Sequence, residues 1–373
     1  MKETEKVSQQ SQLLQSAKSA YDRLNYGLLE TFCHELLLAK PRAALRERLY
    51  AHSYLARHAM HMGHSDEAIT WLGRAKEEIE KQKDLLPLYL FLAAQLAHQR
   101  AHYQEAIFAI EKAQRKLIET NDTELANELK KEKALIWAKY GDLAKARDLG
   151  QTLSDEARFT KGQIEFIAKE YEKALSQFVM AEEMADNESA LISAKESKAQ
   201  ALATLSHIDE AVQLLDECLL LRRDFNGDDN AATHIPMFIK GQLLTKAQAY
   251  TEAEETLTDC FELLVNHCLP THPWMLALSF ERSLCTYLSG HPRGALQELI
   301  KTLDGLQTIY GYEHPLVVKV LMTIAKVQLS LGNEHKAIPA AKDAFAASSS
   351  FLLPTHVMVA KCKELLQQCE GMS

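Results

Sequence analysis

The residues with the clearest capacity for chemistry are four histidines near the N-terminus, His52, His58, His61 and His64. Imidazole binds transition metals and titrates near neutral pH, so such a cluster can form a metal site or a pH-sensitive patch. His58 and His61 lie three residues apart and would share one helical face. His64 follows Gly63, a residue typical of a helix end. We therefore expect solvated or helix-capping histidines, no bound metal and no cofactor.

The cysteines give no sign of a catalytic or metal-binding thiol. None of them forms a C-x-x-C pair, and their spacing fits no zinc site. The seven are Cys33, Cys218, Cys260, Cys268, Cys285, Cys362 and Cys369. Free thiols are typical of a reducing compartment, and the first ten residues lack the apolar segment of a secretory signal. We expect a cytoplasmic protein.

No catalytic motif accompanies these residues. The sequence contains no Gly-rich phosphate loop, no G-x-S-x-G nucleophile motif and no H-E-x-x-H zinc motif. The formal net charge of −9 opposes binding to nucleic acid or anionic lipid, and no apolar stretch is long enough to span a bilayer. We predict that the protein is not an enzyme, has no catalytic residues, does not bind nucleic acid and does not insert into a membrane.

An internal repeat determines which elements the chain must form. In each unit an Ala is followed four residues later by an apolar residue and three further on by a small one, as in Ala253, Leu257 and Cys260. These offsets mark one face of a helix. Another small residue stands twelve positions before each leading Ala: Ala56, Ala94, Gly162, Ala199, Gly241, Ser283 and Ala325. Small residues at both places let two paired helices approach closely.

Turn signals separate these two helical stretches. Gly63, Gly141, Gly290 and Gly332 stand between them, and Gly is typical of the end of a helix. Gly and Pro are otherwise scarce, at 14 and 9 residues, which favours helices. Each unit is therefore predicted to be a helical hairpin.

These hairpins resemble the tetratricopeptide repeat. That repeat has small residues at the same places and an aromatic residue three positions before the leading Ala, as at Tyr103, Tyr171 and Tyr250. The resemblance covers nearly the whole chain. It implies an all-α fold, a right-handed superhelix or α-solenoid of about nine helical hairpins, in which the first helix of each hairpin faces a concave groove.

The last units resemble the kinesin light chain class of this repeat. His272, His314 and His356 lie 42 residues apart, and the first two are followed by Pro. In that class His-Pro opens the first helix, where Pro is well tolerated. We expect these histidines to be structural helix openers. The adjacent Asn residues with which kinesin light chains contact cargo are replaced by Phe280-Glu281 and Met322-Thr323, so their cargo specificity is not implied.

The spacing divides the chain into four regions. Residues 1–48 are expected to form a degenerate hairpin, 49–230 irregular repeats, 231–350 three regular 42-residue repeats, and 351–373 a C-terminal capping helix. One step within the irregular part spans only 28 residues, from Ala146 to Ala174. A full hairpin does not fit comfortably there, so we expect a distorted junction near residues 149–160.

The resemblance also implies a binding surface. An aromatic residue or Met stands three positions before the small residue in several units, and Gln stands one position after it. In tetratricopeptide proteins this edge lines the groove, which implies a peptide-binding site formed by Phe91, Gln95, Phe159, Gln163, Gln200, Phe238, Gln242, Phe280 and Met322. A Gln amide can both donate to and accept from a peptide backbone, and Phe offers apolar area for anchoring. The alternative is that these phenylalanines only fill gaps between hairpins.

We predict a non-catalytic adaptor or scaffold that binds another protein or an extended peptide in this groove. One alternative is a peptide-responsive regulator, similar in architecture to the Rap-type tetratricopeptide sensors. Another is a structural subunit of a larger assembly, which would use the convex face. The partner and the oligomeric state stay open at this point.

Overall fold

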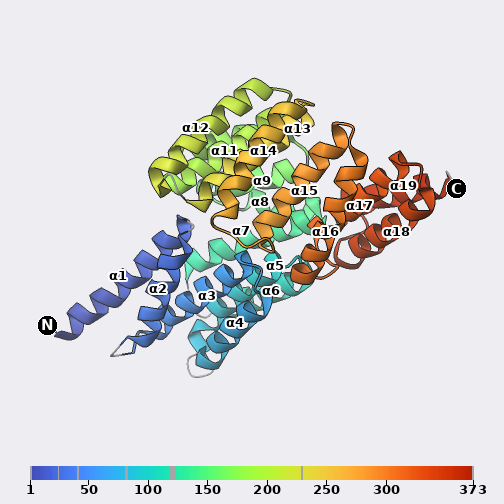
Figure 1. The fold of residues 1–373 in the computed structure, drawn as a ribbon. Coiled ribbons are helices and arrows are strands. Elements are labelled where there is room, and N and C mark those ends of the chain that lie inside the picture. Colours follow the sequence, from blue (N-terminus) through green and yellow to red (C-terminus); the bar gives the residue numbers. More distant parts are fainter. Residues whose placement is uncertain are drawn as a thin grey trace. The chain divides into compact units, whose positions relative to one another are not determined.

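A computed structural model of the chain describes residues 2–23, 25–39, 42–79, 83–117, 122–227 and 230–371. Within these ranges the chain is built from α-helices and short 3-10 turns and contains no strand (Figure 1). The helices are α1 (Lys2–Asp22), α2 (Tyr26–Leu38), α3 (Leu45–His61), α4 (Ser65–Ile79), α5 (Leu86–Gln99), α6 (Tyr103–Leu117), α7 (Thr123–Tyr140), α8 (Leu143–Gln151), α9 (Arg158–Ile167), α10 (Tyr171–Glu183), α11 (Glu188–Thr204), α12 (Ile208–Asn226), α13 (His234–Lys246), α14 (Tyr250–Val265), α15 (Pro273–Leu288), α16 (Pro292–Tyr310), α17 (Pro315–Ser330), α18 (Glu334–Phe351) and α19 (Val357–Gly371). The predicted all-α fold is confirmed.

The chain forms two compact units, Met1–Glu132 and Lys133–Ser373. The division falls inside α7 and follows the packing of the helices. The four regions expected from the sequence follow the repeat spacing instead, so their boundaries stay predictions.

Consecutive helices pair into hairpins, and small residues make this possible. The pairs include α5 with α6, α13 with α14 and α17 with α18. A Cβ atom on Gly241 of α13 would lie 2.4 Å from a methyl carbon of Leu257 in α14, which is far inside van der Waals contact. A Cβ atom on Gly162 would similarly lie 2.6 Å from the ring of Phe178. The small residue predicted from the repeat is therefore required for the close approach of the two helices.

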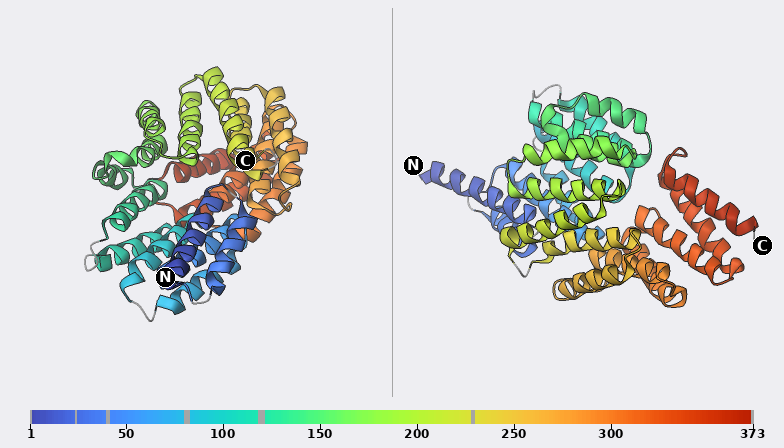
Figure 2. Two further views of the ribbon diagram at one scale, coloured as in Figure 1. Left: turned by 90° about the vertical axis from the view of Figure 1, so that its left-hand side faces the viewer. Right: turned by 90° about the horizontal axis from the view of Figure 1, so that it is seen from above.

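The hairpins of the second unit stack into two layers. From α11 onward, each odd-numbered helix also contacts the next odd-numbered helix: α11 with α13, α13 with α15, α15 with α17 and α17 with α19. Among the described residues, no comparably extensive contact joins one even-numbered helix to the next. Because a curved array is compressed on its concave side, these contacts make the odd helices its inner layer and the even helices its outer layer. Figure 2 shows the helices of this array, coloured from green to red, in two further views.

The second unit closes on itself at its two ends. The turn between α18 and α19 meets the turn between α7 and α8: the Leu353 N–H donates to the Tyr140 carbonyl at 3.0 Å. The Thr355 hydroxyl donates to the carbonyl of Gly141 at 3.3 Å, across 214 positions of sequence. Helix α19 then packs against α18, with Cys362 and Cys369 fully buried.

The junction expected near residues 149–160 is irregular. Helix α8 has nine residues and α9 has ten. A 3-10 turn, η2 (Asp155–Ala157), connects them. Gly150 is buried, and a Cβ atom there would lie in ordinary van der Waals contact with Ile164, at 3.4 Å, so the two short helices lie close together at this point.

The three repeated histidines open helices, as predicted. The Nδ1 atom of each accepts a hydrogen bond from the N–H two residues later, from Trp274 to His272 at 3.1 Å, from Leu316 to His314 at 3.2 Å and from Met358 to His356 at 3.0 Å. Accepting at Nδ1 requires a neutral imidazole whose proton is on Nε2. Burial favours this state, lowering the pKa of His314 to about 4 and also the pKa of His356.

Candidate functional site

The phenylalanines expected in the groove pack against neighbouring helices to different degrees. Phe91 is 9% exposed and Phe280 only 4%. Phe159 is half-buried, and its ring centroid lies 5.9 Å from that of Phe178 in the partner helix. Phe238 packs against the core around Leu257. Phe91 and Phe280 are therefore not the exposed anchors that we expected. Their buried environment fits the alternative, in which these phenylalanines fill gaps between helices.

A buried ion pair shows that this position faces the second helix of its own hairpin. Helix α11 has Glu196 at the place where other units have Phe, three residues before Ala199. Its carboxylate accepts two hydrogen bonds from Arg222 of α12, at 2.6 and 2.8 Å. Both residues are buried. The side chain at this position thus points toward the second helix of its own hairpin, and a charge there needs a buried partner.

The amide residues have a different environment. Gln95, Gln163, Gln200 and Gln242 are each partly exposed, as is Met322, on the odd helices α5, α9, α11, α13 and α17. The last three amides belong to the second unit and stand at equivalent places on three successive inner helices. The Nε2 atom of Gln242 donates to the Glu281 carboxylate of α15 at 2.6 Å. The inner layer therefore presents these polar side chains together with few large apolar ones.

Glu281 is a residue of this surface that the sequence did not identify as a site residue. It lies on α15, between α13 and α17. Burial raises the pKa of its carboxyl, while the hydrogen bond from Gln242 and the charges of Lys319 and Lys246 act in the opposite direction. Its side chain still has some exposure to solvent, as expected for a group at the bottom of a concave surface. One sequence signal could have identified it: Glu281 stands at one of the two positions where kinesin light chains have their cargo-contacting Asn residues.

The first unit has a related contact between two inner helices. The Nδ1 atom of His98 in α5 lies 2.5 Å from the Glu132 carboxylate of α7. The Nε2 atom of His98 and the Oε1 atoms of Gln95 and Gln99 are buried, and none has a hydrogen-bond partner among the residues described. One face of α5 thus has unused hydrogen-bonding capacity.

The four N-terminal histidines do not converge on a common point. Each contacts a different neighbour: His52 with Glu78 at 3.6 Å, His58 with Glu30 at 2.9 Å, His61 with Tyr21 at 3.3 Å and His64 with Glu67 at 3.4 Å. Across the described ranges, no three potential ligands form a metal-binding group. The expectation of solvated or capping histidines is wrong for His52 and His58, because both are buried, His52 against α4 and His58 against α2.

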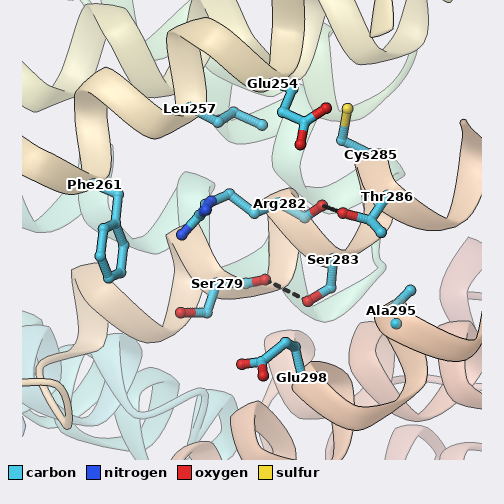
Figure 3. A pocket seen from close by; sticks show the side chains of 11 residues that line it. Glu254, Leu257, Phe261, Ser279, Arg282, Ser283, Cys285, Thr286, Ala295 and Glu298 are labelled. Atoms are coloured by element: carbon cyan, nitrogen blue, oxygen red, sulfur yellow. Dashed lines mark hydrogen bonds between the residues drawn. The ribbon is translucent and has the colours of Figure 1, made fainter. Parts of the chain in front are cut away.

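A pocket of about 370 Å³ lies between inner helix α15 and the outer helices α14 and α16 that flank it (Figure 3). Arg282 of α15 extends across it toward Phe261, and its guanidinium carbon lies 4.7 Å from that ring's centroid. Glu254 and Glu298 stand on the two walls. The side chain of Arg282 is therefore directed to the outer side, away from the inner layer.

Comparisons with known proteins support the fold. No protein-family model and no curated protein matches the sequence. A solved Rap protein, complexed with Competence and Sporulation Factor, is similar over 99% of this chain and 98% of its own, at 14% identity and a TM-score of 0.51. A tetratricopeptide repeat protein from Parabacteroides merdae is similar over 76% of this chain and 98% of its own, at 16% identity and a TM-score of 0.48. Repeats of a putative kinesin light chain from Podospora anserina are similar over 59% of this chain and 93% of theirs, at 15% identity and a TM-score of 0.37.

At 14% identity, the likeness to the Rap protein shows the fold, an all-α solenoid of helical hairpins of the tetratricopeptide type. None of the helices described is long and apolar enough to cross a membrane.

Proposed function

We propose that this protein is a non-catalytic adaptor that binds an extended segment of another protein along the inner layer of its second unit. The observation that supports this most directly is the row of partly exposed amides, Gln163, Gln200 and Gln242, at equivalent places on three successive inner helices. Each amide can both donate and accept a hydrogen bond. Such a row matches the alternating donors and acceptors of an extended backbone.

The dimensions of helices and extended chains agree with this arrangement. Packed helices lie about 10 Å apart, and an extended chain rises about 3.3 Å per residue. One step from an inner helix to the next therefore corresponds to about three peptide residues. A segment of about six to nine residues would contact all three amides. The Rap protein that shares this fold was solved in complex with Competence and Sporulation Factor, which supports a proposal of ligand binding by the solenoid.

The proposal includes no catalytic step, nucleic acid or cofactor, and we expect a cytoplasmic location. Burial raises the pKa of Cys33, Cys218 and Cys260 to about 12. These thiols stay protonated at neutral pH, and a protonated thiol is a poor nucleophile. They serve instead as small apolar residues at helix contacts.

Selection of peptides from a displayed library of random 12-residue sequences tests the proposal. Peptides selected on the full chain should bind at least tenfold more weakly to a Gln200→Glu/Gln242→Glu variant, because a carboxylate cannot donate a hydrogen bond to a peptide carbonyl as an amide can. The matched control is Gln297→Glu, at an exposed position of outer helix α16, which should bind normally. Failure to select any peptide would contradict the proposal. Equal binding of the selected peptides to the two variants would also contradict it, provided that both variants keep the melting temperature of the natural protein.

The alternatives from the sequence make different predictions in the same experiment. A peptide-responsive regulator should show altered hydrogen exchange at a remote point when peptide binds, most informatively at the Tyr140–Leu353 contact. A structural subunit should bind through its outer layer and be sensitive to Gln297→Glu. An adaptor should show neither effect.

A further inference from the structure

The three regular hairpins separate their charges between the two layers. Inner helices α13, α15 and α17 carry five basic residues and one acidic residue, a net charge of +4: Lys240, Lys246, Arg282, Lys319, Lys326 and Glu281. Outer helices α14, α16 and α18 carry four basic and nine acidic residues, a net charge of −5. The inner layer is thus basic in a chain whose overall net charge is −9.

Two of the basic residues are already engaged elsewhere. Lys240 donates to Asp216 of outer helix α12 at 2.7 Å, and Arg282 extends into the outer pocket. The other three, Lys246, Lys319 and Lys326, are exposed. Within the part of the chain that the structure describes, they form no ion pair. We call these three residues the lysine surface.

The lysine surface lies beside the amide row. Lys326 follows Ala325 as Gln242 follows Gly241, so on α17 a lysine takes the place of the amide. Lys246 and Lys319 belong to the helices on either side of α15, and both act electrostatically on the carboxyl of Glu281. Glu281 is the only carboxylate that α13, α15 and α17 provide. The free charge on this part of the inner layer is therefore positive.

We propose that the inner layer of α13, α15 and α17 selects an anionic extended segment, one rich in Asp and Glu, with its carboxylates at the lysine surface and Glu281 as the one group that opposes it. This inference rests on the proposed function and names the chemistry of the partner. Lysine ammonium groups are flexible point charges, which suits several carboxylates along a chain better than one fixed geometry. Attraction on a concave surface is also less screened by solvent than on a flat one.

The role of Glu281 gives the proposal a distinctive consequence. A ligand carboxylate near Lys246 and Lys319 lies close to the carboxylate of Glu281, and like charges repel. Replacing Glu281 with Gln removes this repulsion and keeps a group that can hydrogen-bond to Gln242. The variant E281Q should therefore bind an anionic peptide more tightly than the natural protein does. A purely structural role for Glu281 predicts equal or weaker binding.

Fluorescence polarisation with three labelled 12-residue peptides of alternating Ser and Glu, Ser and Gln, or Ser and Lys tests the inference on the full chain. The Glu peptide should bind saturably and at least tenfold more tightly than the Gln peptide, and the Lys peptide should not bind. The double variant Lys246→Glu/Lys319→Glu should lose at least tenfold in affinity for the Glu peptide. E281Q should gain about threefold or more.

A matched control separates the surface from the overall charge. Lys301 and Lys342 lie on outer helices α16 and α18, with side chains 73% and 59% exposed. Lys301→Glu/Lys342→Glu changes the net charge by the same amount and should leave binding of the Glu peptide within about twofold. Equal weakening by both double variants would overturn the inference, because the effect would then come from net charge.

The experiment also distinguishes this inference from the proposed function. If the random library gives inner-layer peptides but the Glu peptide binds no better than the Gln peptide, the charge selection is wrong and the adaptor function stands. If E281Q weakens binding, the opposing role of Glu281 is wrong. If neither the library nor the three peptides bind, both proposals fail.

Discussion

Gly141, at the turn between α7 and α8, lies directly against His356, the residue that caps α19. A Cβ atom at position 141 would lie 2.9 Å from the Cβ of His356, and Gly141 has a φ angle of +112°. Both the backbone conformation and the space therefore require glycine. This contact joins the turn that follows α7 to the turn that precedes α19.

Replacing Gly141 with Ala should destabilise the protein by about 2–4 kcal/mol, since it adds strain at positive φ and a steric conflict with His356. Urea denaturation of the full chain measures this. Gly332→Ala is the control, because Gly332 also has a positive φ, +71°, but no atom within 4 Å of a Cβ at that site. It should cost about 1–2 kcal/mol. Equal costs for the two variants would show that the His356 contact contributes nothing.

Acid should weaken the protein through its helix-opening histidines. The pKa of His314 is lowered to about 4 by burial, with Lys319 and Lys139 adding to the effect, whereas an unfolded histidine titrates near 6.5. As the pH falls below about 6.5, the unfolded state binds a proton first, so stability present above that pH is lost progressively toward pH 4. Denaturation at pH 7 and pH 5 should show a loss on the order of 1 kcal/mol from this residue.

The His314→Asn variant checks the origin of that loss. Asn is a good N-cap and does not titrate in this range, so the variant should lose less stability between pH 7 and pH 5 than the natural protein. The same pH dependence in both proteins would assign the effect to other groups, such as His234, whose pKa burial lowers to about 3.

Removing one member of the Arg222–Glu196 pair should destabilise the protein strongly, whereas replacing both members should destabilise it much less. Arg222→Met leaves the buried Glu196 carboxylate without its two hydrogen bonds and should cost about 3–5 kcal/mol. The double variant Arg222→Met/Glu196→Met removes both charges and should recover most of that loss. Thermal and chemical denaturation of the two variants measure the difference. A double variant as unstable as the single one would mean that the ion pair itself is needed.

Phe280→Ala should destabilise the protein by about 3–5 kcal/mol, because the residue is only 4% exposed and its removal leaves a cavity. Phe108, on the first unit's helix α6, is 64% exposed and provides the control, for which we expect less than about 1 kcal/mol. Denaturation again provides the comparison. A small effect at Phe280 would return that residue to the candidate ligand anchors.

The phenylalanine positions illustrate where prediction from the sequence stopped. Successive residues of a helix are rotated by about 100°, so Phe238 and Gln242, four apart, differ by only about 40° around the helix. One is packed against the hairpin core and the other is partly exposed on the inner layer. A difference of 40° is decided by how the whole helix is rotated against its neighbours. Spacing alone does not contain that rotation.

The sequence by itself determined the features that depend on neighbours in the chain. The small residues at Gly162 and Gly241, the helix openers His272, His314 and His356, and the short junction near residues 149–160 all follow from local spacing, because a hairpin's two helices are joined by a few residues. Only the tertiary structure decided the contact of Gly141 with His356, the place of Glu281 between Lys246 and Lys319, and which layer is basic. These depend on the rotation accumulated from hairpin to hairpin, which arises from side-chain packing between units.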